Sequence, residues 1–186
     1  MKRISEHYDA TSSKRRTLRS GSPILQLKNL NNWIKSVLIS RYVRKGDRVL
    51  DLACGRGGDL AKFSHANVSQ WVGVDISPKS VDAARSRYES RSMRFAADFK
   101  VLDFCSEFPG GTFDVASCQF ALHYAFSSES RALDFFRNVK SALVPGGYFI
   151  ATVPDEQALR RASKQNPLYS IDFKGGTFEP YAPYDF

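Results

Sequence analysis

The fold of this chain is decided by the stretch Arg48-Val49-Leu50-Asp51-Leu52-Ala53-Cys54-Gly55-Arg56-Gly57-Gly58-Asp59-Leu60. A short apolar run that contains one acid enters a turn dense in glycine, and the residues after the turn have the composition of a helix. This order of strand, turn and helix is typical of the first unit of a nucleotide-binding α/β fold. The glycines let the backbone turn without a Cβ clash and approach a ligand closely. The stretch therefore predicts a ligand site where the first strand ends.

The composition is that of one globular domain. A chain of 186 residues, with 42% hydrophobic and 25% charged residues, is long enough to bury a core. It has no apolar run long enough to cross a bilayer, and its polar N-terminus has no apolar core of a secretory signal. The three cysteines, Cys54, Cys105 and Cys118, are widely spaced and predict neither a zinc site nor a disulfide framework. We therefore expect a reducing compartment and no membrane partner.

The charge favours a polyanionic partner. A formal net charge of +8 attracts phosphate over long range, although ordinary surface charge that keeps the protein in solution is the alternative. Basic residues are dense among Ser and Thr at the N-terminus, where aliphatic residues are almost absent. We expect residues 1–22 to form a basic arm and residues 23–186 to form the folded domain.

Beyond the arm, patterns typical of helices alternate with patterns typical of strands. We expect helices over 23–42, 58–66, 78–88, 128–142 and 155–165. We expect strands over 48–52, 70–76, 95–103, 112–118 and 148–153, and an edge strand over 169–174. A loop is expected over 119–124 and a tight turn over 144–147. This alternation predicts an α/β fold with a doubly wound, mostly parallel sheet, incomplete at its C-terminal end.

The first helix is expected to be amphipathic. Its apolar residues recur at helical spacing and form one stripe: Leu27, Leu30, Trp33, Ile34, Val37, Leu38 and Tyr42. Asn31 and Lys35 are four residues apart, so they share a face at the flank of this stripe.

Acids lie at or near the ends of three successive predicted strands. Asp51 precedes the glycine turn by two residues, Asp75 ends the second strand and Asp103 ends the third. Open α/β sheets bind ligands at this carboxyl edge. Asp75 has the position of an acid that accepts from ribose hydroxyls, and Asp103 is placed to accept from an adenine amino group. The alternative for each acid is that it caps the following helix.

The ligand is decided by charge. Ala53-x-Gly55-x-x-Gly58 nearly matches a dinucleotide fingerprint, but a pyrophosphate there would meet the uncompensated carboxylate of Asp51. S-adenosylmethionine has no phosphate and carries a sulfonium and an ammonium, both of which favour nearby acids. The pattern therefore favours a class I S-adenosylmethionine-dependent methyltransferase with a Rossmann-like fold over a nicotinamide enzyme.

Longer motifs resemble one family. They are Asn29-Leu30-Asn31-Asn32-Trp33-Ile34-Lys35, Val49 to Leu60, Ser117-Cys118-Gln119-Phe120-Ala121-Leu122-His123-Tyr124 and His7-Tyr8-Asp9. Together they resemble the eukaryotic mRNA cap (guanine-N7) methyltransferases, over about residues 7–186. The resemblance implies transfer of a methyl group from S-adenosylmethionine to N7 of the guanine cap, in the nucleus, with S-adenosylhomocysteine as product. Residues 23–186 would then be the methyltransferase domain.

The resemblance also implies roles for individual residues. Together with Asp51, the expected donor set is Lys35, Ala53, Gly55, Asp75, Asp103, Gln119 and Tyr124. The expected cap set is Asn31, Asn32, Arg56, Lys62, Arg87 and His123. From the residues alone, Lys62 and Arg87 also suit a solvated helix face, and His123 also suits an ordinary loop histidine. Ala53 stands where the family more usually has glycine, so a backbone contact there requires a φ that suits a Cβ.

The chemistry asks little of side chains. Guanine N7 has a free lone pair and no proton, so we expect neither a catalytic base nor a metal, and catalysis by proximity and orientation. The expected partner is the capped 5′ end of mRNA, with other capping enzymes. Because members of the family continue further, either the chain is a fragment or a second chain supplies the remainder. The alternatives are a class I methyltransferase for another RNA or a small molecule, and a non-catalytic module that binds donor or RNA.

Overall fold

The computed structural model describes Glu6, Asp9 and residues 24–106 and 111–162, together with the backbone of four short strands that follow. His7, Tyr8 and the rest of the basic arm lie outside the described residues. Within the described part, helices and strands alternate in the predicted order.

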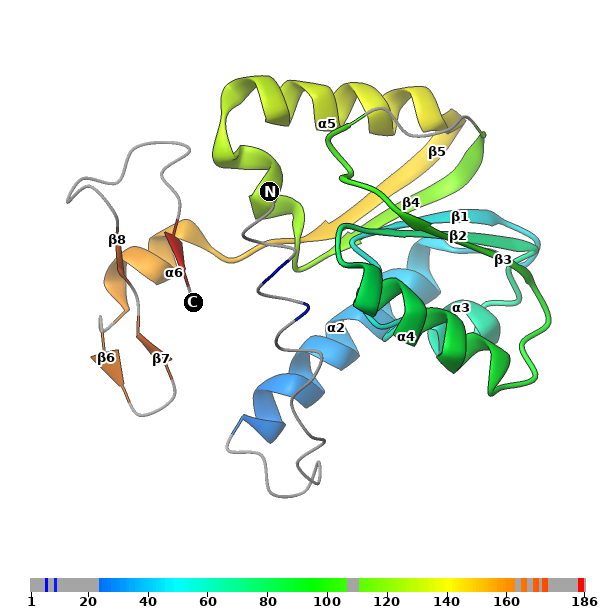
Figure 1. Ribbon diagram of the computed structural model, residues 1–186, viewed down its shortest axis with the longest axis horizontal. Helices are drawn as coiled ribbons and strands as arrows, with labels where there is room; N and C mark the ends of the chain where they lie inside the picture. Colours follow the sequence, from blue (N-terminus) through cyan, green and yellow to red (C-terminus); the bar gives the residue numbers. More distant parts are fainter. Residues whose placement is uncertain are drawn as a thin grey trace.

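A five-stranded parallel sheet forms the centre of the domain, with the strand order β3-β2-β1-β4-β5 (Figure 1). Its strands are β1 (Arg48–Leu52), β2 (Gln70–Asp75), β3 (Ala96–Val101), β4 (Phe113–Gln119) and β5 (Leu143–Thr152). The chain leaves β1 on one side to form β2 and β3 and returns to its other side to form β4 and β5. This reversal beside β1 is a topological switch point, where open sheets bind ligands. The predicted doubly wound parallel sheet is confirmed.

Helices cover both faces of the sheet (Figure 1). On one face lie α2 (Leu25–Tyr42), α3 (Leu60–His65) and α4 (Pro78–Glu89), which share a buried cluster with Trp71. On the other face η2 (Leu122–Ser127, a 3-10 helix) and α5 (Glu129–Ala142) pack around Phe135. Helix α4 begins as predicted, because the Ser77 hydroxyl accepts from the Ser80 N–H and Pro78 follows at the first helical position.

Some predicted boundaries are wrong. Of the loop expected over 119–124, only Phe120 and Ala121 lie outside an element, because Gln119 ends β4 and Leu122 begins η2. The turn expected over 144–147 lies inside β5 as a bulge, because the register shifts between the pairs Phe113–Leu143 and Val115–Tyr148. The helix expected over 155–165 is α6 (Glu156–Arg161), which is shorter.

The prediction of one edge strand over 169–174 is also wrong. Two separate antiparallel pairs take its place: β6 (Gln165–Asn166) with β7 (Tyr169–Ser170), and β8 (Asp172–Phe173) with β9 (Tyr184–Asp185). None of these four strands joins the parallel sheet. Pairing with a neighbour in sequence costs less loop-closure entropy than reaching a distant sheet edge.

The apolar stripe of α2 is only partly buried. Of the predicted stripe, Leu38 and Tyr42 pack against the core, and the buried residue of this helix is Ile39, which the predicted stripe did not include. The residues Leu27, Leu30, Trp33 and Val37 remain 41–61% exposed. Figure 1 shows why: the first turns of α2 project away from the sheet, and only its last turns lie beneath β1.

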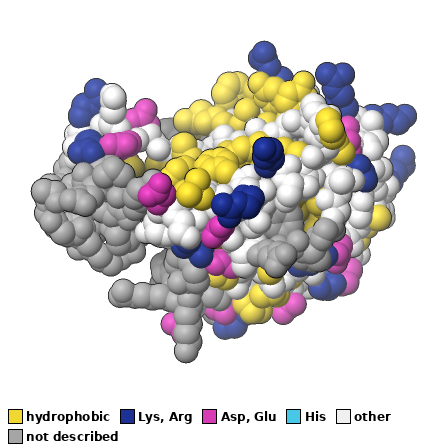
Figure 2. Space-filling model, turned by 90° about the horizontal axis from the view of Figure 1, so that it is seen from above, with side chains coloured by type: hydrophobic (Ala, Val, Ile, Leu, Met, Phe, Trp, Pro, Cys, Tyr) yellow, Lys and Arg dark blue, Asp and Glu magenta, His cyan; other side chains and the backbone are white. Residues whose placement is uncertain are grey.

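A second apolar surface lies on the opposite layer. The side chains of Phe126, Leu133 and Phe136 are exposed on η2 and α5. Figure 2 views the molecule from this side and shows hydrophobic side chains gathered here, with lysine and arginine side chains around them.

The turn after β1 is built from left-handed backbone. The φ angles are +56° at Ala53, +52° at Gly55 and +67° at Gly57. A Cβ at Gly57 would lie 2.5 Å from Leu60 Cδ1, so glycine is also required for the close packing of α3 against the turn. Ala53 has a Cβ and lacks the conformational freedom of glycine, and a left-handed conformation costs such a residue about 1–2 kcal/mol.

Replacing Ala53 with glycine, the residue more usual in the resembling family, should therefore stabilise the protein. We expect Ala53→Gly to raise the free energy of unfolding by about 1 kcal/mol, since relief of the backbone strain exceeds the added entropy of the unfolded chain. Urea denaturation measures the change. Ala83→Gly, inside α4, is the matched control and should lower stability by about 1 kcal/mol. A lower urea midpoint for Ala53→Gly would contradict the assignment of strain.

Candidate functional site

The predicted ligand residues meet at the carboxyl edge of the sheet. Asp51 lies in β1, Asp75 ends β2, Asp103 follows β3 and Gln119 ends β4. These four strands are neighbours in the sheet, with β1 between β2 and β4. Asp51 and Asp75 are both buried. The sheet thus brings acids from three strands to one edge, as the sequence indicated.

The Asp75 carboxylate holds the glycine turn to the next helix. Its Oδ2 accepts the Gly55 N–H at 2.8 Å, and its Oδ1 accepts the Ser77 N–H at 2.9 Å. The Ser77 hydroxyl donates in turn to Asp9 at 2.6 Å, which brings one residue of the basic arm to this edge. Burial raises the pKa of Asp75, and these backbone N–H groups partly oppose the shift.

Asp51 is the deepest acid at this edge. Burial raises its pKa well above the usual range, the carboxylate of Asp59 adds to the shift, and Lys35 opposes it. Burial also raises the pKa of the Cys54 thiol, with Asp51 as a further cause. The main cause of both shifts is the loss of hydration, and a cation bound beside Asp51 would replace that hydration and favour its charged form.

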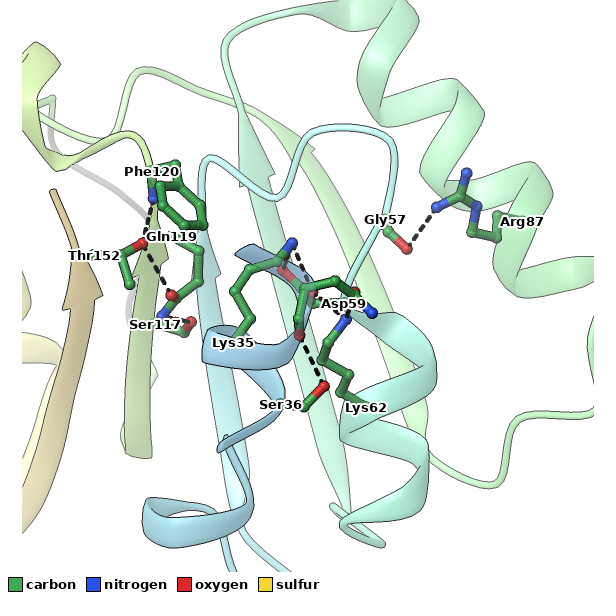
Figure 3. Close-up of polar contacts among 11 residues, drawn as sticks. Lys35, Ser36, Gly57, Asp59, Lys62, Arg87, Ser117, Gln119, Phe120 and Thr152 are labelled. Carbon is green, nitrogen blue, oxygen red and sulfur yellow. Dashed lines mark hydrogen bonds and ion pairs between the residues drawn. The ribbon is translucent and has the colours of Figure 1, made fainter. Parts of the chain in front are cut away.

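A hydrogen-bonded group links helices α2 and α3 through Asp59 (Figure 3). Lys35 Nζ donates to Asp59 Oδ2 at 2.9 Å, and Lys62 Nζ lies 2.8 Å from Asp59 Oδ1. Lys62 also donates to Asn32 Oδ1 at 2.6 Å. We call Asn32, Lys35, Asp59 and Lys62 the Asp59 cluster. It joins a residue expected in the donor set to two residues expected in the cap set.

Sequence reasoning gave Asp59 no role. Its signal was its place, immediately after the last glycine of the turn and three residues before Lys62. The alternative of a solvated helix face does not hold for Lys62, whose side chain is only 13% exposed. It does not hold for Arg87 either, which is half-buried and donates to the Gly57 carbonyl at 3.1 Å.

The remaining predicted cap residues lie close to these elements in the chain. Asn31 is half-buried on α2, beside Asn32, and Arg56 is exposed in the glycine turn. In Figure 3, Arg87 approaches the turn from α4, and Lys35 and Lys62 lie on the side of α2 and α3. Cationic side chains therefore flank a turn whose inner side carries buried carboxylates.

The segment after β4 is held by Thr152 of β5, which the sequence did not indicate. Phe120 has a left-handed φ of +58°, and its N–H donates to Thr152 Oγ1 at 2.8 Å. The same hydroxyl donates to Gln119 Oε1 at 3.2 Å (Figure 3). A non-glycine residue in this conformation is strained and is held there by its surroundings. The hydrogen bonds of Thr152 that hold Phe120 in this conformation therefore also fix the start of the segment that leads into η2.

His123 and Tyr124, two of the residues expected in the site, lie next to each other on η2, and their rings form a pair. The rings of His123 and Tyr124 have centroids 4.2 Å apart. Burial lowers the pKa of His123, so its imidazole is neutral over more of the physiological range. The pair offers flat surfaces and polar atoms without a positive charge.

Asp103 is paired with Arg131, a residue that sequence reasoning also missed. Arg131 donates to both carboxylate oxygens at 3.0 Å, and the Cys105 N–H donates to Oδ1 at 3.0 Å. The sequence offered no signal for this contact, because the two residues lie far apart and on different elements. Among the described residues, no cluster of His, Cys, Asp and Glu could hold a metal ion. In the same part of the chain, no helix is long and apolar enough to cross a membrane.

The fold is that of S-adenosylmethionine-dependent methyltransferases. The DhpI–SAH complex superposes with a TM-score of 0.62 at 19% identity, over 82% of this chain and 69% of that one. An S-adenosylmethionine-dependent methyltransferase from Clostridium acetobutylicum gives a TM-score of 0.61 at 18% identity, over 86% and 60%. The architecture and the ligand edge thus define a class I, Rossmann-like methyltransferase fold.

Sequence comparison defines the family. Residues 1–179 match the mRNA (guanine-N(7))-methyltransferase domain, and the chain belongs to that family. The mRNA cap guanine-N(7) methyltransferase 1 of Oryza sativa is 40% identical over 95% of this chain and 51% of its own. The corresponding proteins of Arabidopsis thaliana and Saccharomyces cerevisiae are 41% and 37% identical, over 92% and 95% of this chain and 52% and 46% of theirs. The chain spans about half the length of the curated relatives it matches.

The raised pKa of Asp51 predicts a stability that depends on pH. Because folding favours its protonated form, its contribution is fully present below the ordinary carboxyl pKa and is lost as pH rises through the raised value. Thermal unfolding of the ligand-free protein is measured from about pH 4 to pH 8. The Tm of the native chain should fall as the pH rises, and the Tm of Asp51→Asn should fall less. The exposed Asp82→Asn is the control and should keep the native slope. Equal slopes for all three proteins would contradict the assignment.

Proposed function

We propose that this chain binds S-adenosylmethionine at the carboxyl edge of its sheet and transfers the methyl group to N7 of the guanine cap of mRNA. S-adenosylhomocysteine is the second product. One observation carries the proposal: buried carboxylates, Asp51 and Asp75, lie at the edge where the turn after β1 begins, and lysine and arginine side chains from α2, α3 and α4 flank the same turn. Such a turn suits a cationic donor and a polyanionic acceptor at once.

The residues present fit the donor. Buried Asp51 and Asp75 favour the sulfonium and ammonium charges, whereas a pyrophosphate at this turn would be repelled. The Asp75 carboxylate accepts backbone N–H groups, among them those of Gly55 and Ser77, and with about four lone-pair positions it retains capacity for a ribose hydroxyl. Lys35 supplies a cation for the carboxylate of the donor. Gly55 and Ala53 are assigned through their backbone. Asp103 after β3, Gln119 at the end of β4 and Tyr124 on η2 complete the set.

The cap set fits a triphosphate bridge and a purine. Arg56, Lys62 and Arg87 are the proposed phosphate ligands, and Lys62 is already oriented by Asp59 and Asn32. Asn31 and Asn32 on α2 offer amide groups for the nucleoside. The ring pair of His123 and Tyr124 offers a stacking surface.

The mechanism follows from the nucleophile. When bound, the donor supplies an electrophilic methyl group on a sulfonium sulfur. Guanine N7 has no proton to lose, so no residue is assigned as a catalytic base. The protein contributes orientation, a term that can be worth about 7–11 kcal/mol. A neutral His123 adds no repulsion as the guanine gains positive charge. The proposed partner is the capped 5′ end of mRNA, in the nucleus, where capping enzymes act.

The first test is transfer by the chain itself. Incubation with labelled S-adenosylmethionine and a cap analogue should label the analogue, and mass spectrometry should place the methyl group on N7. Asp75→Ala should weaken S-adenosylhomocysteine binding by more than about tenfold in calorimetry, since it removes charge-assisted hydrogen bonds. Asp82→Ala, on the surface of α4, is the control. Donor binding without transfer would support a binding module, and methylation of unrelated RNA would support another methyltransferase.

The second test separates the two substrates. Arg56→Ala combined with Lys62→Ala should raise the KM for capped RNA by more than about tenfold, with a much smaller effect on the KM for the donor. The double variant Arg137→Ala and Lys140→Ala removes the same charge from α5 and should leave both constants near native values. A similar rise for both double variants would indicate general electrostatics rather than a cap site.

A further inference from the structure

We propose that Arg131 is a positioning residue that holds Asp103 as the acceptor for the 6-amino group of the donor's adenine. In this way Arg131 sets the preference of the site for adenine over a 6-oxopurine. The inference rests on the proposed donor site, and it concerns a residue on α5, remote in sequence from the glycine turn.

The first observation is the geometry of the pair. Arg131 Nη1 donates to Asp103 Oδ2 and Nη2 donates to Oδ1, both at 3.0 Å. The two side chains are 25% and 18% exposed, so solvent only partly screens them. A guanidinium that binds both oxygens fixes the plane of the carboxylate as well as its distance. Arg131 is itself held at the start of α5, where its backbone N–H donates to the Ser128 hydroxyl at 3.3 Å.

The second observation is that one face of α5 holds the whole segment around Asp103. Phe135 packs edge-on against Phe104, with ring centroids 5.3 Å apart. Asn138 Nδ2 donates to the Ser106 carbonyl at 2.6 Å. Arg131, Phe135 and Asn138 are four and three residues apart, so they share a helix face. The position of Asp103 is therefore set by α5 as much as by β3.

The third observation is a count of acceptor positions. A carboxylate has about four lone-pair positions, two on each oxygen. Oδ1 accepts from Arg131 and from the Cys105 N–H, and Oδ2 accepts from Arg131. Among the hydrogen bonds of the described residues, this leaves one acceptor position, on Oδ2. A 6-amino group can donate to that position, whereas a 6-oxo group would present a lone pair to it.

Loss of Arg131 frees the carboxylate to rotate. The Cys105 N–H would remain its partner, but a single hydrogen bond does not fix the plane of the group. Arg131→Gln removes the bidentate contact, and Arg131→Lys keeps the charge but not the fork. Asp103→Asn removes the charge of the acceptor itself while Arg131 remains.

The experiment is a pair of calorimetric titrations for each protein, with S-adenosylhomocysteine and with S-inosylhomocysteine, which carries a 6-oxopurine. The native chain should prefer the adenine compound by at least about tenfold. Arg131→Gln and Asp103→Asn should lose most of this preference, mainly through weaker binding of the adenine compound, and Arg131→Lys should lie between them and the native chain. Arg137→Gln, further along α5, is the matched control and should keep the native ratio.

The ratio of the two affinities is the decisive readout, because it does not depend on the fraction of a variant that is folded. A native ratio in Arg131→Gln would overturn the inference and leave Arg131 as a purely structural residue, while the donor site would stand. If the native chain binds neither compound, or if Asp75→Ala leaves binding unchanged, the donor site itself is wrong. The inference then fails with it, and the native or Asp75 result identifies the cause.

Discussion

The site depends on one buried anion that binds two cations. Asp59 is buried at the start of α3 and accepts from Lys35 of α2 and from Lys62 of its own helix. A buried charge is stable only when it is paired. Removing Asp59 would leave the two lysines without their anion, and removing the lysines would leave a buried carboxylate without a cation. Lys35 belongs to the proposed donor set and Lys62 to the proposed cap set. On the proposed function, one carboxylate would therefore set the relative position of the two substrates.

Around Asp59 the fold concentrates unfavourable local features. Ala53 and Phe120, which follow the neighbouring strands β1 and β4, both have left-handed backbone, and Asp51 is buried with a raised pKa. The free-energy cost of the strained backbone and the buried charge at this edge is offset by the burial of apolar side chains on both faces of the sheet. The strained backbone and the buried charge coincide with the edge where the topology places a ligand.

The architecture and much of the site could be predicted from the sequence, because both depend on local patterns. Alternating apolar runs indicated the sheet, and acids near strand ends, Asp51, Asp75 and Asp103, indicated the ligand edge. Contacts between distant elements could not be predicted this way: neither the Asp59 cluster nor the pairing of Arg131 with Asp103 has a signature in spacing. Exposure on α2 was also missed, since periodicity shows that a helix has an apolar face but not how far the helix extends past the sheet.

The buried acids have a consequence for the end of the reaction. In the proposed reaction Asp51 and Asp75 attract a sulfonium, but once the methyl group has moved, the sulfur is a neutral thioether and the new positive charge is on the guanine. On the proposed function, the carboxylates then hold the spent donor less tightly than the fresh one. The same charges that attract the fresh donor therefore weaken the hold on the spent one, so its release is favoured by electrostatics already present in the resting protein.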